Sequence, residues 1–295
     1  MGIEITIRTN SNISYFQKNL RKLIETKNTD TLLLSSGFFQ QSILEDKKLV
    51  SLINKHCAKL ILIGAQTVER NTGDQTYNNY RHFARYLVCN TKKVNISIYM
   101  AKEKKWHGKI ALKIDDKTPL VGIAGSSNLT EPAYSDDCEN FNYETDVLIW
   151  APEVDDVFSY STNEYLDSND IFPPMITELK EGIIQKNEKD RLKGLYDIIM
   201  NGSILEPVNF FSVEEDAVIG AIKAFEQNTD IKNFVNCIKV INDNAQKLSF
   251  QCCDYVRVYY INPVSNFINS NSTINNERKT KIINLLRGLE AKLKY

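Results

Sequence analysis

The stretch Trp106-His107-Gly108-Lys109 holds the residue types in this sequence that are best suited to chemistry. Side chains at positions i and i+2 of a β-strand project from the same face, so a strand predicted over residues 107–114 places the imidazole of His107 beside the ammonium of Lys109. An imidazole can act as a nucleophile or proton carrier, and a fixed positive charge stabilises the non-bridging oxygens of a phosphoryl group. The pair therefore predicts phosphoryl chemistry.

Two further polar groups follow at the ends of predicted strands. The strand predicted over residues 120–124 runs into Gly125-Ser126-Ser127-Asn128, where small residues let the backbone approach an anion and the Asn128 amide can donate hydrogen bonds. Asn142-Tyr143-Glu144 precedes an apolar strand, and a carboxylate there can bind one ring nitrogen of His107 and leave the other free to attack. Glu139 is the alternative carboxylate for that role.

The order HxK, GSxN and Asn-x-Glu ahead of an apolar strand resembles the phospholipase D superfamily, whose half-signature is HxK-x4-D-x6-GSxN. The resemblance covers about residues 30–150, and the single HxK motif with a separate C-terminal part is similar to the metal-independent restriction endonucleases of that superfamily. Two departures stand out, because the family aspartate would fall at Ile114 and the interval from Asn128 to Glu144 is extended.

The resemblance implies a phosphodiester transfer in two steps through a phosphohistidine, without a metal or other cofactor. Family members need two HxK motifs, and this chain has one, because neither of its other two histidines has a lysine two positions later. The resemblance therefore implies a homodimer with one active site on its two-fold axis. Each subunit would contribute the catalytic residues His107, Lys109, Ser126, Asn128 and Glu144.

The charge distribution favours nucleic acid as the substrate. Residues 1–110 carry a net charge of +10, whereas residues 111–170 carry −12. A surplus of basic residues leading up to the site attracts a polyanion. The run just before the motif predicts nucleic-acid contacts through Lys102, Lys104, Lys105 and Trp106, although a solvated strand edge is an equal alternative for the same residues.

The first 170 residues alternate between strand-like and helix-like patterns, which predicts an α/β layered fold with a mixed sheet. The resemblance implies that this domain, over residues 1–172, is a phospholipase D-like α/β/α layered domain. Helical periodicity dominates residues 173–295, with helices predicted over 175–200, 214–241 and 275–293 and one strand over 248–261. We expect this second, mainly α-helical domain to serve DNA recognition, dimerisation or binding of a partner protein.

Composition excludes several classes of protein. No apolar stretch approaches the roughly 20 residues of a membrane-spanning helix. The first residues lack the basic-then-apolar pattern of a secretory signal, and the six cysteines show no paired CxxC spacing. We therefore expect a cytoplasmic protein with reduced thiols and no membrane contact.

The resemblance, taken with the charge distribution, implies a metal-independent endonuclease that acts on DNA, of the restriction or defence type. The sequence leaves two alternative functions open. One is an RNA or non-specific nuclease gated by a partner through the helical domain, and the other is a phospholipid phosphodiesterase. Discrete DNA fragments, partner-dependent smearing and hydrolysis of vesicle lipids would distinguish the three.

Overall fold

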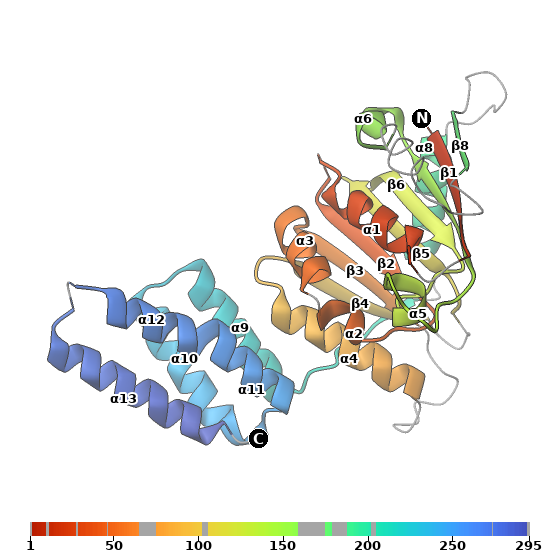
Figure 1. Cartoon of the computed structure of the whole chain (residues 1–295). Coiled ribbons are helices and arrows are strands. Elements are labelled where there is room, and N and C mark those ends of the chain that lie inside the picture. Colours follow the sequence, from red (N-terminus) through yellow and green to blue (C-terminus); the bar gives the residue numbers. More distant parts are fainter. Residues whose placement is uncertain are drawn as a thin grey trace. The chain divides into compact units, whose positions relative to one another are not determined.

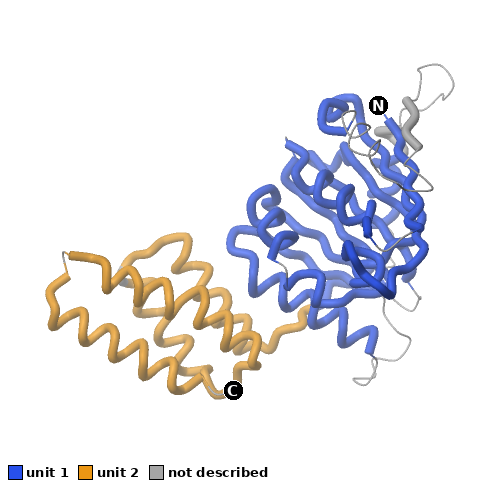
Figure 2. Tube along the Cα trace, viewed as in Figure 1, with its two compact units in different colours: residues 1–208 blue, residues 209–295 orange. Residues whose placement is uncertain are grey.

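The computed structural model describes residues 2–9, 12–27, 29–45, 47–64, 75–101, 106–158, 175–178, 188–201, 205–272 and 274–293. The chain divides into two compact units, residues 1–208 and residues 209–295 (Figure 2). The first unit holds the β-sheet with its covering helices, and the second consists of helices.

The first unit is built on a nine-stranded mixed sheet among the described residues, in the order β8-β1-β7-β6-β5-β2-β3-β4-β9 (Figure 1). Strands β2, β3 and β4 run parallel, and all other neighbours pair antiparallel. The strands are β1 (Gly2–Arg8), β2 (Thr31–Ser35), β3 (Lys59–Gly64), β4 (Asn95–Ala101), β5 (Lys109–Asp115), β6 (Thr118–Gly125), β7 (Glu144–Trp150), β8 (Met175–Glu178) and β9 (Leu205–Pro207).

Helices cover both faces of this sheet, which confirms the predicted α/β/α layers. The group α1 to α5 packs together over one face, and α8 packs against the other (Figure 1). The helices are α1 (Tyr15–Glu25), α2 (Ser42–Glu45), α3 (Lys48–His56), α4 (Gln75–Asn90), α5 (Glu131–Tyr134), a 3₁₀ turn η1 (Pro152–Val154), α6 (Asp155–Phe158) and α8 (Glu188–Asn201).

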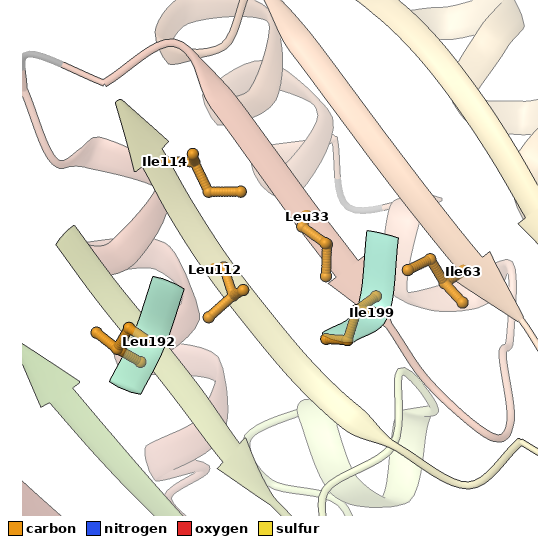
Figure 3. Packing of buried hydrophobic residues seen from close by; sticks show 6 residues of the cluster. All are labelled: Leu33, Ile63, Leu112, Ile114, Leu192 and Ile199. Atoms are coloured by element: carbon orange, nitrogen blue, oxygen red, sulfur yellow. The ribbon is translucent and has the colours of Figure 1, made fainter. Parts of the chain in front are cut away.

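The central strands are apolar on both faces because both faces are covered. On one face, Leu33, Ile63 and Leu112 form a buried cluster with Leu192 and Ile199 of α8 (Figure 3). Neighbouring residues along β2 alternate to the opposite face, where the helices of the α1 group cover them. The sheet is thereby held rigidly from two sides.

A buried lysine ties β5 to the end of α3. The Lys113 side chain has no exposed area, and its ammonium donates to the His56 carbonyl oxygen at 2.7 Å and lies 3.2 Å from Cys57 Sγ. Carbonyl groups at a helix C-terminus carry a partial negative charge, so they suit a cation. Burial raises the pKa of the Cys57 thiol, and the charge of Lys113 partly opposes this rise. The strand that carries Lys109 is thus anchored at its middle.

The second unit is a bundle of helices whose apolar faces form its own core. Its buried residues include Val218, Ile222, Ile241 and Leu286. The helices are α9 (Val213–Gln227), α10 (Ile231–Asn244), a 3₁₀ turn η2 (Ala245–Lys247), α11 (Phe250–Val256), a π-helical turn η3 (Arg257–Ile261), α12 (Asn262–Ser270) and α13 (Asn276–Lys292).

The structure corrects three expectations. The division between the units falls after Val208 instead of after residue 172, because β8, α8 and β9 complete the sheet of the first unit. Residues 175–178 form strand β8 at the sheet edge, so the helix predicted from residue 175 begins at Glu188. The segment predicted as a strand over residues 248–261 is helical from Phe250 onward, in α11 and η3.

The misassigned strand shows how packing overrides local preference. The segment is rich in aromatic and β-branched residues, which favour strands. Its buried residues nevertheless include Cys252, Val256 and Tyr260, which recur at the i, i+4, i+8 spacing of a helix face. Burial in the bundle therefore determined its conformation.

The structure also bears on the expectations from composition. Within the described ranges, no helix is both long enough and apolar enough to span a bilayer. All six cysteines are free thiols, and five of them are buried.

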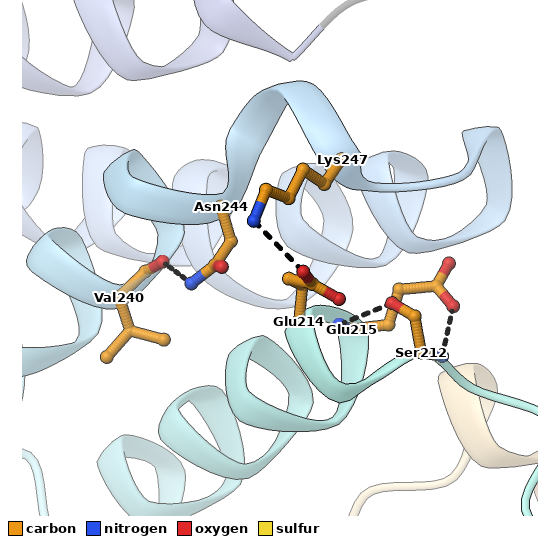
Figure 4. A network of polar contacts seen from close by, with 6 residues as sticks. All are labelled: Ser212, Glu214, Glu215, Val240, Asn244 and Lys247. Carbon is orange, nitrogen blue, oxygen red and sulfur yellow. Dashed lines mark hydrogen bonds and ion pairs between the residues drawn. The ribbon is translucent and has the colours of Figure 1, made fainter.

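A single carboxylate caps two helices of the second unit. Glu215 is buried, and its Oε2 accepts a hydrogen bond from the Ser212 N–H at 3.0 Å while Ser212 Oγ accepts from the Glu215 N–H at 3.2 Å (Figure 4). Its Oε1 accepts from the N–H of Ser249, the N-cap of α11, at 3.2 Å. This side chain therefore couples the starts of α9 and α11.

We predict that Glu215→Ala lowers the free energy of unfolding by about 1–2 kcal/mol, because it removes the acceptor of the Ser212 and Ser249 N–H groups at two helix starts. The matched control is Glu214→Ala, which removes a surface ion pair with Lys247 and leaves the urea midpoint nearly unchanged. Urea unfolding followed by circular dichroism measures both. Equal losses for the two variants would contradict the capping role.

Candidate active site

Three strand ends that are distant in sequence lie side by side, at one end of the central strands of the sheet. Lys109 at the start of β5 pairs with Gly125 at the end of β6, and Gly125 pairs in turn with Asp146 of β7. Glu144 begins β7 and pairs with Arg8 at the end of β1. The sheet therefore brings together the three motifs that the sequence placed in separate segments.

The His107 and Lys109 side chains lie side by side, as the predicted spacing requires. Strand β5 begins at Lys109 and not at residue 107, yet Lys109 Nζ contacts His107 Nδ1 and donates to the His107 carbonyl oxygen at 3.0 Å. The imidazole is exposed, and its Nε2 has no hydrogen-bond partner in the described part of the chain. Nε2 is therefore the ring nitrogen open to a substrate.

The Lys109 ammonium is in a partly buried position. Burial lowers the pKa of Lys109, and the carboxylate of Glu144 acts in the opposite direction. Glu144 thus helps to keep a cation beside the imidazole.

Trp106 anchors the segment that leads into the motif. Its indole Nε1 donates to Ser35 Oγ at 2.6 Å, and Ser35 Oγ donates to the Gly108 carbonyl oxygen at 2.9 Å. A Cβ at Gly108 would lie 2.9 Å from the Trp106 ring, so only glycine allows the ring to pack this closely. Trp106 also packs against the apolar cluster beneath α8.

Of the four residues predicted to contact nucleic acid, the structure describes Trp106 alone. Trp106 is half-buried in the anchor just described, and its contact with nucleic acid stays a prediction. The three predicted lysines, Lys102, Lys104 and Lys105, lie outside the described residues.

Both serines of the Gly125–Asn128 loop are held by carboxylates of β7. Ser126 Oγ donates to Glu144 Oε2 and accepts from the Thr145 N–H at 2.9 Å. Ser127 Oγ donates to Asp146 Oδ2 at 2.6 Å, and its N–H donates to Asp146 Oδ1 at 3.3 Å. Residues i and i+2 of a strand share a face, so the two carboxylates receive neighbouring serines.

The close approach of loop and strand requires a glycine. A Cβ at Gly125 would lie 2.5 Å from the Thr145 carbonyl oxygen and would collide with the Asp146 carboxylate. Any side chain at this position would push the loop away from β7.

Asn128 is oriented by the loop that follows β2. Its Oδ1 accepts from the Phe38 N–H at 3.2 Å and lies 3.2 Å from Ser36 Oγ. Ser36 Oγ also accepts from the Leu129 N–H at 3.1 Å. Because Oδ1 is engaged, the Nδ2 hydrogens are the donors that the amide can offer to a ligand.

The structure brings Glu144, and not Glu139, to this group of residues. Glu144 is buried and bonded to Ser126, whereas Glu139 is exposed in the turn ahead of β7. Within one chain the partner of Glu144 is Ser126, so the predicted bond from Glu144 to the imidazole of His107 stays a prediction.

Sequence reasoning missed three features of the site: Asp146, the Ser36–Phe38 loop and Arg8. Burial raises the pKa of Asp146 to about 6, Ser127 opposes this through two hydrogen bonds, and the charge of Glu144 adds to it. The small polar residues that follow the apolar strand β2 were the available signal for the loop. No local pattern marked Asp146 as the partner of Ser127.

Arg8 supports the other side of the site. Its guanidinium donates to the carbonyl oxygens of Pro132, Ala133 and Ser135 at 3.0, 3.1 and 2.8 Å. These bonds fix α5 and the residue that follows it beside the strand end that carries Glu144.

Comparison with known proteins identifies the family of the first unit. Residues 18–164 match the family described as NgoFVII restriction endonuclease N-terminal PLD domain. No curated protein shows significant similarity to the chain.

Several solved structures resemble the chain remotely. Nuc from Salmonella typhimurium, a phospholipase D family member, is 15% identical over 56% of this chain and 93% of its own, with a TM-score of 0.35. NucT from Helicobacter pylori is 14% identical over 55% and 92%, with a TM-score of 0.30. Polyphosphate kinase from Porphyromonas gingivalis is 12% identical over 58% and 27%, with a TM-score of 0.35. Similarity this remote carries no conclusion about substrate.

The family match spans the HxK segment, the Gly125–Asn128 loop and Glu144, which are the residues that the sheet gathers at one edge. The first unit of this chain therefore belongs to the phospholipase D superfamily, in its restriction-endonuclease branch, and is a hydrolytic phosphodiesterase domain of the nuclease type.

Proposed function

We propose that this protein is a metal-independent DNA endonuclease of the restriction or defence type that works through a phosphohistidine in a homodimeric active site. The observation that carries the proposal is the contact between Lys109 Nζ and His107 Nδ1 at an exposed sheet edge. That contact places a cation beside the imidazole, and Nε2 is the ring nitrogen that faces a substrate. To attack, Nε2 must be the unprotonated nitrogen, so in the reacting state Nδ1 carries the ring proton and donates it to a carboxylate, while Lys109 turns to the phosphate. The family supports the phosphodiester chemistry.

The first step forms a bond between His107 Nε2 and the phosphorus of the diester and breaks the bond from phosphorus to the leaving oxygen. The leaving oxygen needs a proton, which a second imidazole donates. In the second step this imidazole takes a proton from water, the water oxygen attacks phosphorus, and the N–P bond breaks. One imidazole must therefore begin neutral and the other protonated.

A second copy of the chain supplies the second imidazole. The sequence holds a single HxK motif. The surface around it is exposed at His107 and Ser126, as a site shared by two subunits requires before they meet. A two-fold axis through this edge would pair the same residues from both copies.

The charges of the transition state would be stabilised by groups already in place. Lys109 offers an ammonium and Asn128 offers its Nδ2 hydrogens, and two subunits double both. Because Ser126, Ser127 and Asn128 are each held by a different partner, the donors do not need to reorganise during the reaction. We also propose that the carboxylate of Glu144 orients an imidazole of His107 in the dimer.

DNA is the proposed substrate because the chain from residue 1 to residue 110 carries a net charge of +10 and the matched family is that of a restriction endonuclease. The lysines at 102, 104 and 105 would contact phosphates. The helical second unit would recognise DNA, extend the dimer contact or bind a partner protein.

The first test is digestion of plasmid DNA in excess EDTA, with sequencing of the fragment ends. We expect cleavage to persist in EDTA and to fall by about 10³-fold or more in His107→Ala, which removes the nucleophile. His82→Ala is the matched control, because His82 is an exposed histidine without a lysine two positions later, and it keeps wild-type activity.

Discrete fragments indicate a sequence-specific enzyme, and smears or partner-dependent cutting indicate a less specific one. A strict requirement for Mg²⁺ would count against the mechanism. Hydrolysis of vesicle lipids without any effect on DNA would overturn the proposed substrate.

The shared site makes a quantitative prediction for mixed dimers. If both imidazoles are needed, co-expression of wild-type and His107→Ala subunits in equal amounts leaves only wild-type pairs active, or about one quarter of all dimers. Cleavage rates per subunit and the mass of the assembly by analytical ultracentrifugation measure this. Half of the wild-type activity, or a fully active monomer, would contradict the shared site.

The buried Asp146 predicts a pH dependence of stability. Its pKa in the fold is about 6, above the ordinary 3.8, so folding favours the protonated form. Its contribution to the free energy of unfolding therefore increases as the pH falls from about 6 toward 3.8. In Asp146→Asn this increase is absent, so the stability of the wild type relative to the variant grows between pH 7 and pH 4.

Urea unfolding of both proteins at several pH values measures the difference. Ser127→Ala is the companion variant, because it removes a hydrogen bond that lowers the pKa of Asp146 and so moves the change to higher pH. A difference that stays constant from pH 7 to pH 4 would show that Asp146 keeps its charge in the fold.

A further inference from the structure

An exposed aromatic ring stands directly beside the proposed nucleophile. Among the described residues of the first unit, Phe38 and Tyr143 are the exposed aromatic side chains, with 44% and 76% of their surface accessible. A single exposed ring is common on protein surfaces, so the position of the ring, and not its exposure alone, is what distinguishes it. Only Phe38 contacts His107.

Phe38 is held in place by the motif itself. Its ring meets the His107 ring edge-to-face, with centroids 5.6 Å apart and planes at 88°. Its N–H donates to Asn128 Oδ1 at 3.2 Å, and its carbonyl oxygen accepts from Ser36 Oγ at 2.7 Å. The backbone of Phe38 is therefore fixed on both sides, while much of the ring stays open.

This arrangement leaves the exposed part of the Phe38 ring within reach of a bound substrate. A phosphate attacked by His107 Nε2 lies against the imidazole, and the base of the adjoining nucleotide is one sugar away from that phosphate. Aromatic faces bind unstacked bases without regard to their identity, because every base has a π-face. The neighbouring Asn128 and Lys109 provide polar donors for the phosphate.

We propose that Phe38 forms a base-binding subsite, in which its exposed ring stacks on the nucleobase next to the scissile phosphate. The proposal rests on the proposed function, because it requires a nucleic-acid substrate whose scissile phosphate lies at His107. It implies that this base leaves its stack when the strand is bound. A strand whose flanking base is already unpaired is therefore cut faster than the same sequence in an intact duplex.

The test uses an oligonucleotide that spans a cut mapped in the plasmid digest. One version carries normal nucleotides, and the other carries tetrahydrofuran abasic residues on both sides of the cut. With the normal strand, we expect Phe38→Leu to lower kcat/KM by about 5- to 150-fold, the range for loss of one base–aromatic stack. With the abasic strand, Phe38→Leu and wild type should cut equally, and Phe38→Trp should restore the rate on the normal strand.

Three results would overturn the subsite. Equal losses on both strands would mean that Phe38 only orients His107. A weaker dimer in Phe38→Leu, seen by ultracentrifugation, would mean that the ring contacts the second subunit. Unchanged rates on both strands would mean that the ring has no role in cutting.

A binding experiment separates this proposal from the nuclease activity. The protein with His107→Asn is mixed with single-stranded DNA that carries 2-aminopurine, whose fluorescence falls when it stacks on an aromatic ring. We expect quenching that is lost when Phe38→Leu is added to the same protein. Quenching without any cleavage by wild type would overturn the proposed function alone, and binding without quenching would overturn the subsite alone.

Discussion

The register of β5, β6 and β7 is the constraint on which the site depends. Lys109, Gly125 and Asp146 stand in line across these three strands. Side chains alternate along a strand, so a slip of one residue would turn Glu144 and Asp146 to the opposite face and leave both serines without partners. Covering of both sheet faces by apolar helices holds this register, and Lys113 ties the middle strand to α3.

Around this register, the side chains of the Gly125–Asn128 loop are bound one by one. Ser126 is held by Glu144, Ser127 by Asp146, and Asn128 by the loop after β2. The segment that carries His107 and Lys109 is anchored by the hydrogen bond from the Trp106 indole to Ser35 Oγ. Donors held in this way meet a developing negative charge without rearrangement, which is the condition for strong electrostatic stabilisation.

The same contacts explain why the site is open on one side. Buried carboxylates stand behind the loop, whereas His107, Ser126 and the ring of Phe38 are exposed. A substrate and a second subunit would both have to approach from this exposed side. The two compact units have separate cores, so the helical unit can vary in its task while the geometry at the sheet edge is kept.

Short-range patterns in the sequence were enough to predict the α/β/α layers, the HxK pair and the loop from Gly125 to Asn128, because strand alternation and motif spacing involve residues close in the chain. The later division after Val208, the helical state of residues 248–261 and the pairing of Asp146 with Ser127 depended on tertiary structure. These features arise from contacts between distant segments. Local sequence does not encode which edge a strand will join or which buried group a carboxylate will meet.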